Sequence, residues 1–146
     1  MTPKAAIVVG ATGGLGHAAC HALARDWDGV AIGYRSSCDK AKAIAAELPA
    51  TCETLPVHCD LADAASITAS IAQARDHFGG IGTVVFASGV AIEQPFVSKI
   101  SEDQWREVIE TELIGLTRVV SATLPIFREQ KFGNFVIVVS VANYTF

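Results

Sequence analysis

The sequence lacks the features that would place the protein in a membrane, on nucleic acid or in an oxidising compartment. No apolar run in its 146 residues reaches the length of a transmembrane helix. Eleven lysine and arginine residues stand against 15 aspartate and glutamate residues, a net charge of −4 that argues against nucleic-acid binding. The four cysteines show no Cys-x-x-Cys spacing, and the first apolar run starts too early to leave room for a signal peptide. We therefore expect a cytoplasmic protein with reduced thiols.

Internal repeats, low-complexity tracts and linkers are absent as well, which argues against a solenoid or a string of domains. The composition that remains is 51% hydrophobic and 18% charged, which is typical of a folded globular protein rather than a disordered one. A chain of this length can bury a sizeable core. We expect residues 1–146 to form a single domain.

A glycine-rich turn, Gly10-x-x-x-Gly14-x-Gly16, joins an apolar run at residues 5–9 to a helical pattern at residues 17–25. Gly10 permits a sharp turn, Gly14 leaves room for a pyrophosphate, and Gly16 lets the helix pack close to the strand. The free N–H groups of the helix start favour anions. This turn predicts dinucleotide binding, and the alternative is a tight turn without a ligand. The residues assigned to the cofactor here are Gly10, Thr12, Gly13, Gly14, Leu15 and Gly16.

Apolar strand patterns alternate with helical patterns along the rest of the chain. Alternation of this kind predicts parallel strands joined by right-handed helical crossovers. The expected fold is α/β, a Rossmann-type doubly wound parallel sheet with strand order 3-2-1-4-5. Pro56 favours an outer position for the third strand, because proline cannot donate to a ladder. The expected strands are 5–9, 30–34, 55–59, 83–87 and 135–140, and the expected helices are 17–25, 39–48, 63–78 and 101–130.

Three local signals bear on the ends of these elements. Asp63 is the expected N-cap of the third helix, and Ser101 with Gln104 forms the pattern of a capping box. Pro125 predicts a kink or a break near the end of the long helix.

Residues 135–139 are apolar throughout, yet the strand order places them at the sheet edge. We therefore expect an exposed apolar edge, so that the isolated chain self-associates or is soluble only with a complementary chain or a C-terminal extension.

The end of the second strand carries Tyr34-Arg35-Ser36, where NAD-binding proteins usually have a carboxylate for the ribose hydroxyls. A guanidinium with a hydroxyl suits a 2′-phosphate, so NADP(H) is predicted over NAD(H). The alternative for Arg35 is an ordinary solvated arginine. Asp60 follows the third strand, where its carboxylate can accept from the adenine amine, and the equally weighted alternative is a carboxylate that caps the next helix.

His17 and His21 are four residues apart on the first expected helix, a spacing that can bind a metal ion. No third ligand is evident in the sequence. No metal site is therefore predicted.

The chain resembles the short-chain dehydrogenase/reductase family from end to end. The resemblance rests on the glycine turn, on Tyr34-Arg35-Ser36-Ser37, on Cys59-Asp60-Leu61, on Phe78-Gly79-Gly80-Ile81 and on the strand ending Ala87-Ser88-Gly89. It extends over 105–115 and 133–141, which look like the family's fourth long helix and the strand that delivers its catalytic serine. It implies nicotinamide-dependent reduction of a carbonyl or oxidation of an alcohol, for example a 3-oxoacyl-type ketone. It also adds Leu61, Ala87, Ser88 and Gly89 to the expected cofactor site, and it implies a homo-oligomer.

By this resemblance Ser140 matches the catalytic serine, and Glu112 falls where the family has an asparagine. The family's Asn-Asn-Ala-Gly is replaced by Phe86-Ala87-Ser88-Gly89, and its Tyr-x-x-x-Lys motif is not found in the 146 residues. We therefore expect a C-terminally truncated form of the fold whose isolated chain lacks appreciable activity. The alternative is an inactive nucleotide-binding module or a half-enzyme that needs a second chain.

Overall fold

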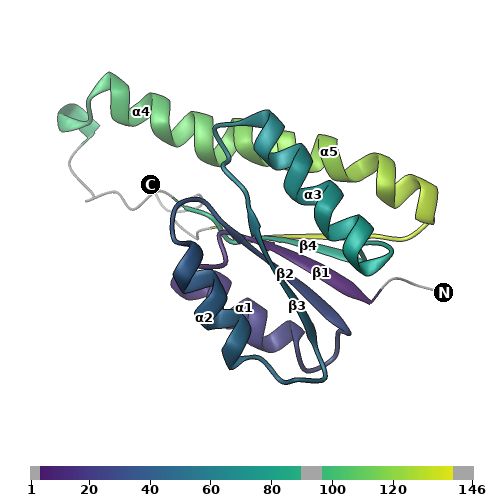
Figure 1. Ribbon diagram of the computed structural model, residues 1–146. Helices are drawn as coiled ribbons and strands as arrows, with labels where there is room; N and C mark the ends of the chain where they lie inside the picture. The colour runs from purple at the N-terminus through teal and green to yellow at the C-terminus, as the bar shows by residue number, and fades with distance from the viewer. Residues whose placement is uncertain (1–3, 90–96, 140–146) are drawn as a thin grey trace.

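The computed structural model describes residues 4–89 and 97–139, and the strands form one parallel sheet in the order β3-β2-β1-β4-β5 (Figure 1). This order confirms the predicted doubly wound fold. Pro56 lies on β3, at the outer edge, as predicted. The strands are β1 (Ala5–Val9), β2 (Gly29–Tyr34), β3 (Glu53–His58), β4 (Thr83–Phe86) and β5 (Asn134–Ile137).

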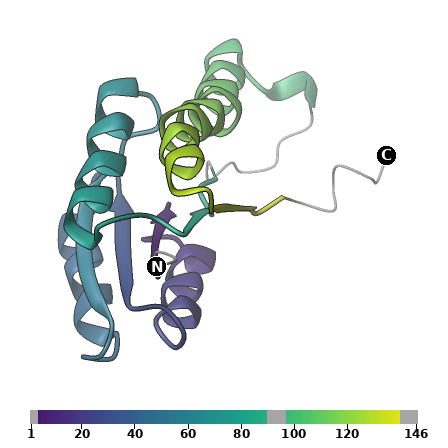
Figure 2. The same ribbon diagram turned by 90° about the vertical axis from the view of Figure 1, so that its right-hand side faces the viewer.

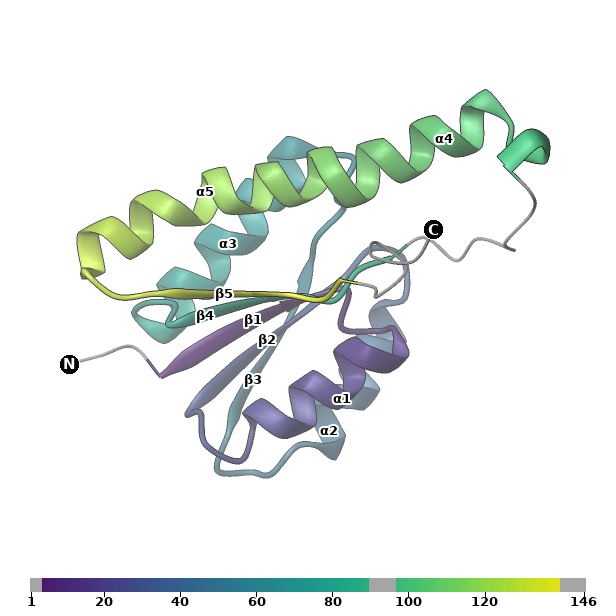
Figure 3. The same cartoon turned by 180° about the vertical axis from the view of Figure 1, so that it is seen from behind.

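Helices cover both faces of the sheet. Figures 1 and 3 show α1 and α2 on one face, and α3 with the long helix formed by α4, η2 and α5 on the other. No helix in the described part of the chain combines the length and the apolarity needed to cross a membrane. The helical segments are α1 (Gly14–Leu23), α2 (Cys38–Glu47), α3 (Ala64–Phe78), the short η1 (Val97–Lys99), α4 (Glu102–Val108), the π-helical η2 (Ile109–Ile114) and α5 (Gly115–Gln130).

The apolar strands build a separate core on each face, because successive side chains of a strand point to opposite sides. Along β1, Ile7 packs in the cluster under α3 and α5, whereas Val8 packs in the cluster under α1 and α2. All of β1 and β4 is buried. In β1 and β4 the continuous apolar runs therefore mark strands that are covered on both faces, as expected for a parallel sheet.

The predicted caps are present, and the long helix differs from its prediction. The Asp63 carboxylate accepts from the Ala65 N–H at 2.8 Å. Ser101 and Gln104 form the reciprocal capping box. No break occurs at Pro125, since α5 continues to Gln130. Between α4 and α5 the chain winds into the wider η2 turn, a feature that local periodicity does not reveal.

All four cysteines are free thiols, as predicted. Burial raises the pKa of Cys20 to about 12 and also raises the pKa of Cys52 and Cys59. These three side chains therefore pack as apolar groups rather than as reactive thiolates.

Strand β5 is the exposed edge that the sequence predicts. It pairs only with β4 among the described strands, and Figure 2 shows it at the outer edge of the sheet. Phe135 packs against Phe127 with ring centroids 5.0 Å apart. In contrast, Val136 is 49% exposed and Val139 is 67% exposed. Ser140, which was expected to end this strand, lies outside the described residues.

Candidate functional site

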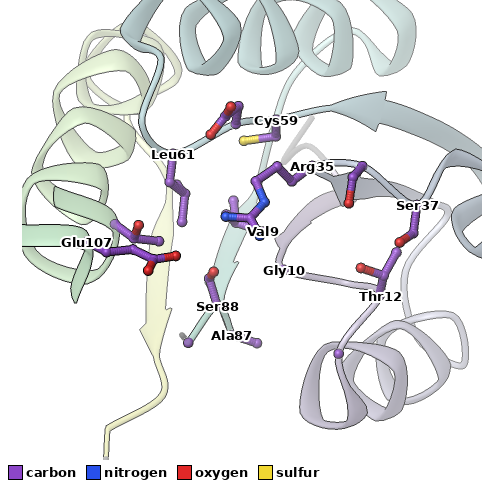
Figure 4. Close-up of a pocket in the computed structure, with 15 residues that line it drawn as sticks. Val9, Gly10, Thr12, Arg35, Ser37, Cys59, Leu61, Ala87, Ser88 and Glu107 are labelled. Atoms are coloured by element: carbon purple, nitrogen blue, oxygen red, sulfur yellow. The ribbon is translucent and has the colours of Figure 1, made fainter. Parts of the chain in front are cut away.

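A cavity of about 330 Å³ opens at the carboxyl ends of the first four strands (Figure 4). In an open parallel sheet this edge, at the point where the strand order reverses, is where ligands bind. The lining residues are Val9, Gly10, Thr12, Gly13, Arg35, Ser36, Ser37, Cys59, Asp60, Leu61, Ala87, Ser88, Gly89, Glu107 and Thr111.

The glycine turn is packed too closely for side chains at two of its positions. Gly10 has φ of 78°, and a Cβ there would lie 2.7 Å from the backbone of Ser88. A Cβ on Gly16 would lie 2.2 Å from the carbonyl oxygen of Gly10. These two glycines thus allow the turn to lie against the end of β4 and allow α1 to start close to β1.

Gly14 differs from its neighbours because a Cβ there would meet no protein atom within 4 Å. It is the first residue of α1, and no side chain in the described residues caps this helix start. The N-terminus of α1 therefore presents backbone N–H groups and the positive end of the helix dipole, next to open space. This arrangement fits a phosphate group.

Arg35 supplies a cation to the cavity. It follows β2, and Figure 4 shows its guanidinium pointing into the middle of the lining residues. Arg35 forms no ion pair with any residue that the structure describes. Tyr34 does not line the cavity, and its ring packs edge-on to His58 at 5.8 Å. Alternation along the strand accounts for this difference between neighbouring residues.

Asp60 lies at the cavity and stabilises the turn after β3, but it does not cap the next helix, which was one of its two predicted roles. One carboxylate oxygen accepts from the Ala62 N–H at 3.0 Å, which holds the turn after β3. The residue also lines the cavity, whereas Asp63, not Asp60, caps α3. Arg118 of α5 braces the same turn by donating to the Leu61 carbonyl at 3.1 Å.

Most of the predicted cofactor residues meet in this cavity, and four do not line it: Gly14, Leu15, Gly16 and Tyr34. Glu107 and Thr111 were missed because they belong to the long helix, and no local motif indicates how far that helix passes over the cavity. Glu112 does not line the cavity, but its carboxylate lies near Gly89, which does, since a Cβ on Gly89 would be 3.8 Å from Glu112 Oε1.

Comparison with known proteins finds a matching family model and similar curated proteins. The model of the short chain dehydrogenase family matches residues 4–145. A 3-oxoacyl-(acyl-carrier-protein) reductase of Staphylococcus aureus is 28% identical over 139 residues, covering 94% of this chain and 56% of that protein. A 3-oxoacyl-(acyl-carrier-protein) reductase of Synechocystis sp. is 30% identical over 143 residues, covering 97% and 58%.

Among solved structures, an alcohol dehydrogenase from the archaeon Thermococcus sibiricus, complexed with 5-hydroxy-NADP, matches with a TM-score of 0.87 at 30% identity. The match covers 98% of this chain and 60% of that one. The chain thus spans between 56 and 60% of the length of these three relatives.

Proposed function

The chain belongs to the short-chain dehydrogenase family, and from this premise we propose that it binds NADP(H) and serves hydride transfer between that cofactor and a carbonyl or alcohol. The observation that carries the proposal is the Arg35 guanidinium, which points into a cavity bounded by the glycine turn (Figure 4). The named relatives favour a 3-oxoacyl-type ketone as the substrate class.

Two places, one beside the cavity and one inside it, fit a phosphate group of a dinucleotide. The uncapped start of α1, beside the open space at Gly14, would hold the pyrophosphate through backbone N–H groups. Arg35 with Ser36 would hold the 2′-phosphate by charge-assisted hydrogen bonds. Asp60 would accept from the adenine amine with the carboxylate oxygen that its turn does not use. The bound cofactor supplies the hydride, and these residues supply its orientation.

The Gly14→Ala substitution tests the pyrophosphate site without disturbing the protein. The added methyl meets no protein atom within 4 Å, so the variant should fold as the wild type does. It enters the space proposed for the pyrophosphate, and we expect NADPH affinity to fall about tenfold, or 1.4 kcal/mol. Isothermal titration calorimetry with NADPH measures the change.

Ala22→Ser is the matched control for this experiment. Ala22 is exposed on the same helix and does not line the cavity, so its affinity for NADPH should equal that of the wild type. Equal affinity of the Gly14→Ala variant and the wild type would show that the pyrophosphate does not bind at the start of α1.

We also propose that the edge of β5 pairs with a second copy of the chain. Val136 and Ile137 of β5, together with Val138 and Val139 just after it, are 41–67% exposed. Residues 135–139 carry no charge or proline that would block pairing. Val136→Lys places a charge on this edge and should convert an associating chain into a monomer. Light scattering on purified protein measures the mass.

Ala43→Lys is the control, because it adds the same charge at an exposed position of α2, on the opposite face of the sheet from α5. It should associate as the wild type does. A wild-type chain that stays monomeric at tens of micromolar, with slow amide exchange throughout β5, would contradict the proposed pairing.

A further inference from the structure

Three potential metal ligands meet on the face of the sheet covered by α1 and α2. His17 and His21 are one helical turn apart on α1, so both side chains lie on the same side of that helix. Glu47 ends the neighbouring α2, which lies beside α1 in Figures 1 and 3. The sequence offers no sign of this third group, because Glu47 is 26 residues beyond His21. None of the three residues lines the cavity described above.

The three ligand atoms form a compact triangle. The Nε2 atoms of His17 and His21 are 3.1 Å apart, and they lie 2.8 and 3.2 Å from the same Glu47 Oε2. Metal–nitrogen and metal–oxygen bonds of about 2.0–2.2 Å put neighbouring ligand atoms about 2.9 Å apart in an octahedron and about 3.3 Å apart in a tetrahedron. The triangle therefore has the dimensions of one face of a metal coordination shell.

Hydrogen bonds alone cannot give all three atoms, the two Nε2 atoms and the Glu47 Oε2, favourable partners at the same time. If both Nε2 atoms carry protons toward Glu47, two donors face one another at 3.1 Å. If one of them is deprotonated, its lone pair faces the carboxylate oxygen instead. A cation seated over the three atoms accepts a lone pair from each, which removes both conflicts.

The surroundings of the cluster suit an ion that exchanges with solvent. The side chains of His17, His21 and Glu47 are 39, 40 and 50% exposed, so an ion has access and water can fill the remaining positions.

We propose that His17, His21 and Glu47 bind a divalent transition-metal ion, with Zn²⁺ as the reference case, which joins α1 to α2. Two imidazoles and one carboxylate favour Zn²⁺, Co²⁺ or Ni²⁺ over Mg²⁺ and Ca²⁺, which prefer oxygen ligands. An ion that binds only the folded chain stabilises it by RT ln(1 + [L]/Kd), where [L] is the free ion concentration and Kd its dissociation constant. The site would therefore strengthen the packing of the two helices beside the glycine turn.

The test is a titration of the full chain with Co²⁺ and Zn²⁺ under reducing conditions. We expect one ion per chain, with a Co²⁺ spectrum free of thiolate-to-metal charge transfer, because no cysteine takes part. His21→Ala should abolish this binding. Glu47→Gln, which keeps the shape of the side chain, should weaken it by about tenfold or more.

His77→Ala is the matched control, because His77 also contacts a carboxylate, Glu53 at 2.9 Å, without a second histidine. Its metal affinity should equal that of the wild type. Thermal unfolding in a chelator shows that each variant is folded, and added Zn²⁺ should raise the melting temperature of the wild type and His77→Ala only. Absence of saturable binding, binding that survives in both His21→Ala and Glu47→Gln, or a thiolate band would overturn the proposal.

Discussion

Replacing Arg35 with alanine is expected to weaken NADPH binding by about 10- to 100-fold and to leave NADH binding within about twofold of the wild type. Hydrogen bonds to charged groups contribute about 1.5–3 kcal/mol, which corresponds to this range of affinity. The loss falls on NADPH alone because only NADPH carries the 2′-phosphate, the group that Arg35 is proposed to bind from the end of β2. Calorimetric titration with each cofactor gives the two affinities.

Arg25→Ala separates this local effect from the general loss of a positive charge. Arg25 is exposed just beyond α1 and does not line the cavity, so its removal should change the affinity for NADPH by less than about twofold. Higher salt should weaken NADPH binding to the wild type more than to Arg35→Ala, since the proposed contact is ionic. If Arg35→Ala retains the NADPH-to-NADH affinity ratio of the wild type, the assignment of Arg35 is wrong.

Gly16→Ala is expected to lower the free energy of unfolding by about 3 kcal/mol or more, the upper range for overpacking a tight site. The added methyl would lie 2.2 Å from the Gly10 carbonyl oxygen and 2.7 Å from the Ala11 Cα. Both contacts are to backbone atoms, which cannot rotate away as a side chain can. To remove these steric clashes, α1 must move away from β1 or the turn must open. Either movement disturbs the core around Cys20 and Val8.

Gly14→Ala provides the matched comparison, because it makes the same substitution two residues earlier, where the methyl meets nothing within 4 Å. It should leave stability unchanged or raise it by up to about 1 kcal/mol, since alanine restricts the unfolded chain more than glycine does. Urea unfolding followed by circular dichroism gives both values, and a difference of 3 kcal/mol corresponds to roughly 6–12 °C in Tm. If the urea midpoints of Gly14→Ala and Gly16→Ala were equal, the turn would accommodate a methyl group at Gly16 more easily than its close packing indicates.

The two glycine variants also separate stability from binding. Gly16→Ala acts on the fold, and Gly14→Ala acts on the space beside the helix start. If the turn served only to connect β1 to α1, Gly16→Ala would lower the stability of the protein, and Gly14→Ala would leave NADPH affinity unchanged. Loss of NADPH affinity in a stable Gly14→Ala variant would therefore support a ligand site rather than a bare turn.

Features that depend only on neighbouring residues could be predicted before the fold was known. Buried parallel strands appear as continuous apolar runs, so β1 and β4 are visible without the fold. A cap needs only a side chain and the N–H groups two or three residues later, which is why Asp63 and Ser101 were identified. The strand order followed because right-handed crossovers leave few arrangements of alternating strands and helices.

Contacts between segments that are far apart in the sequence could be found only from the three-dimensional structure. Glu107 and Thr111 reach the cavity because the long helix passes over the ends of the strands, and Glu47 reaches His17 because α2 lies beside α1. Tyr34 turns away from the cavity although it precedes Arg35. Such contacts depend on the lengths of helices and on how they cross the sheet. Helix lengths and crossing geometry are set by packing over the whole core, and no hydrophobic periodicity in a single segment of the sequence predicts them.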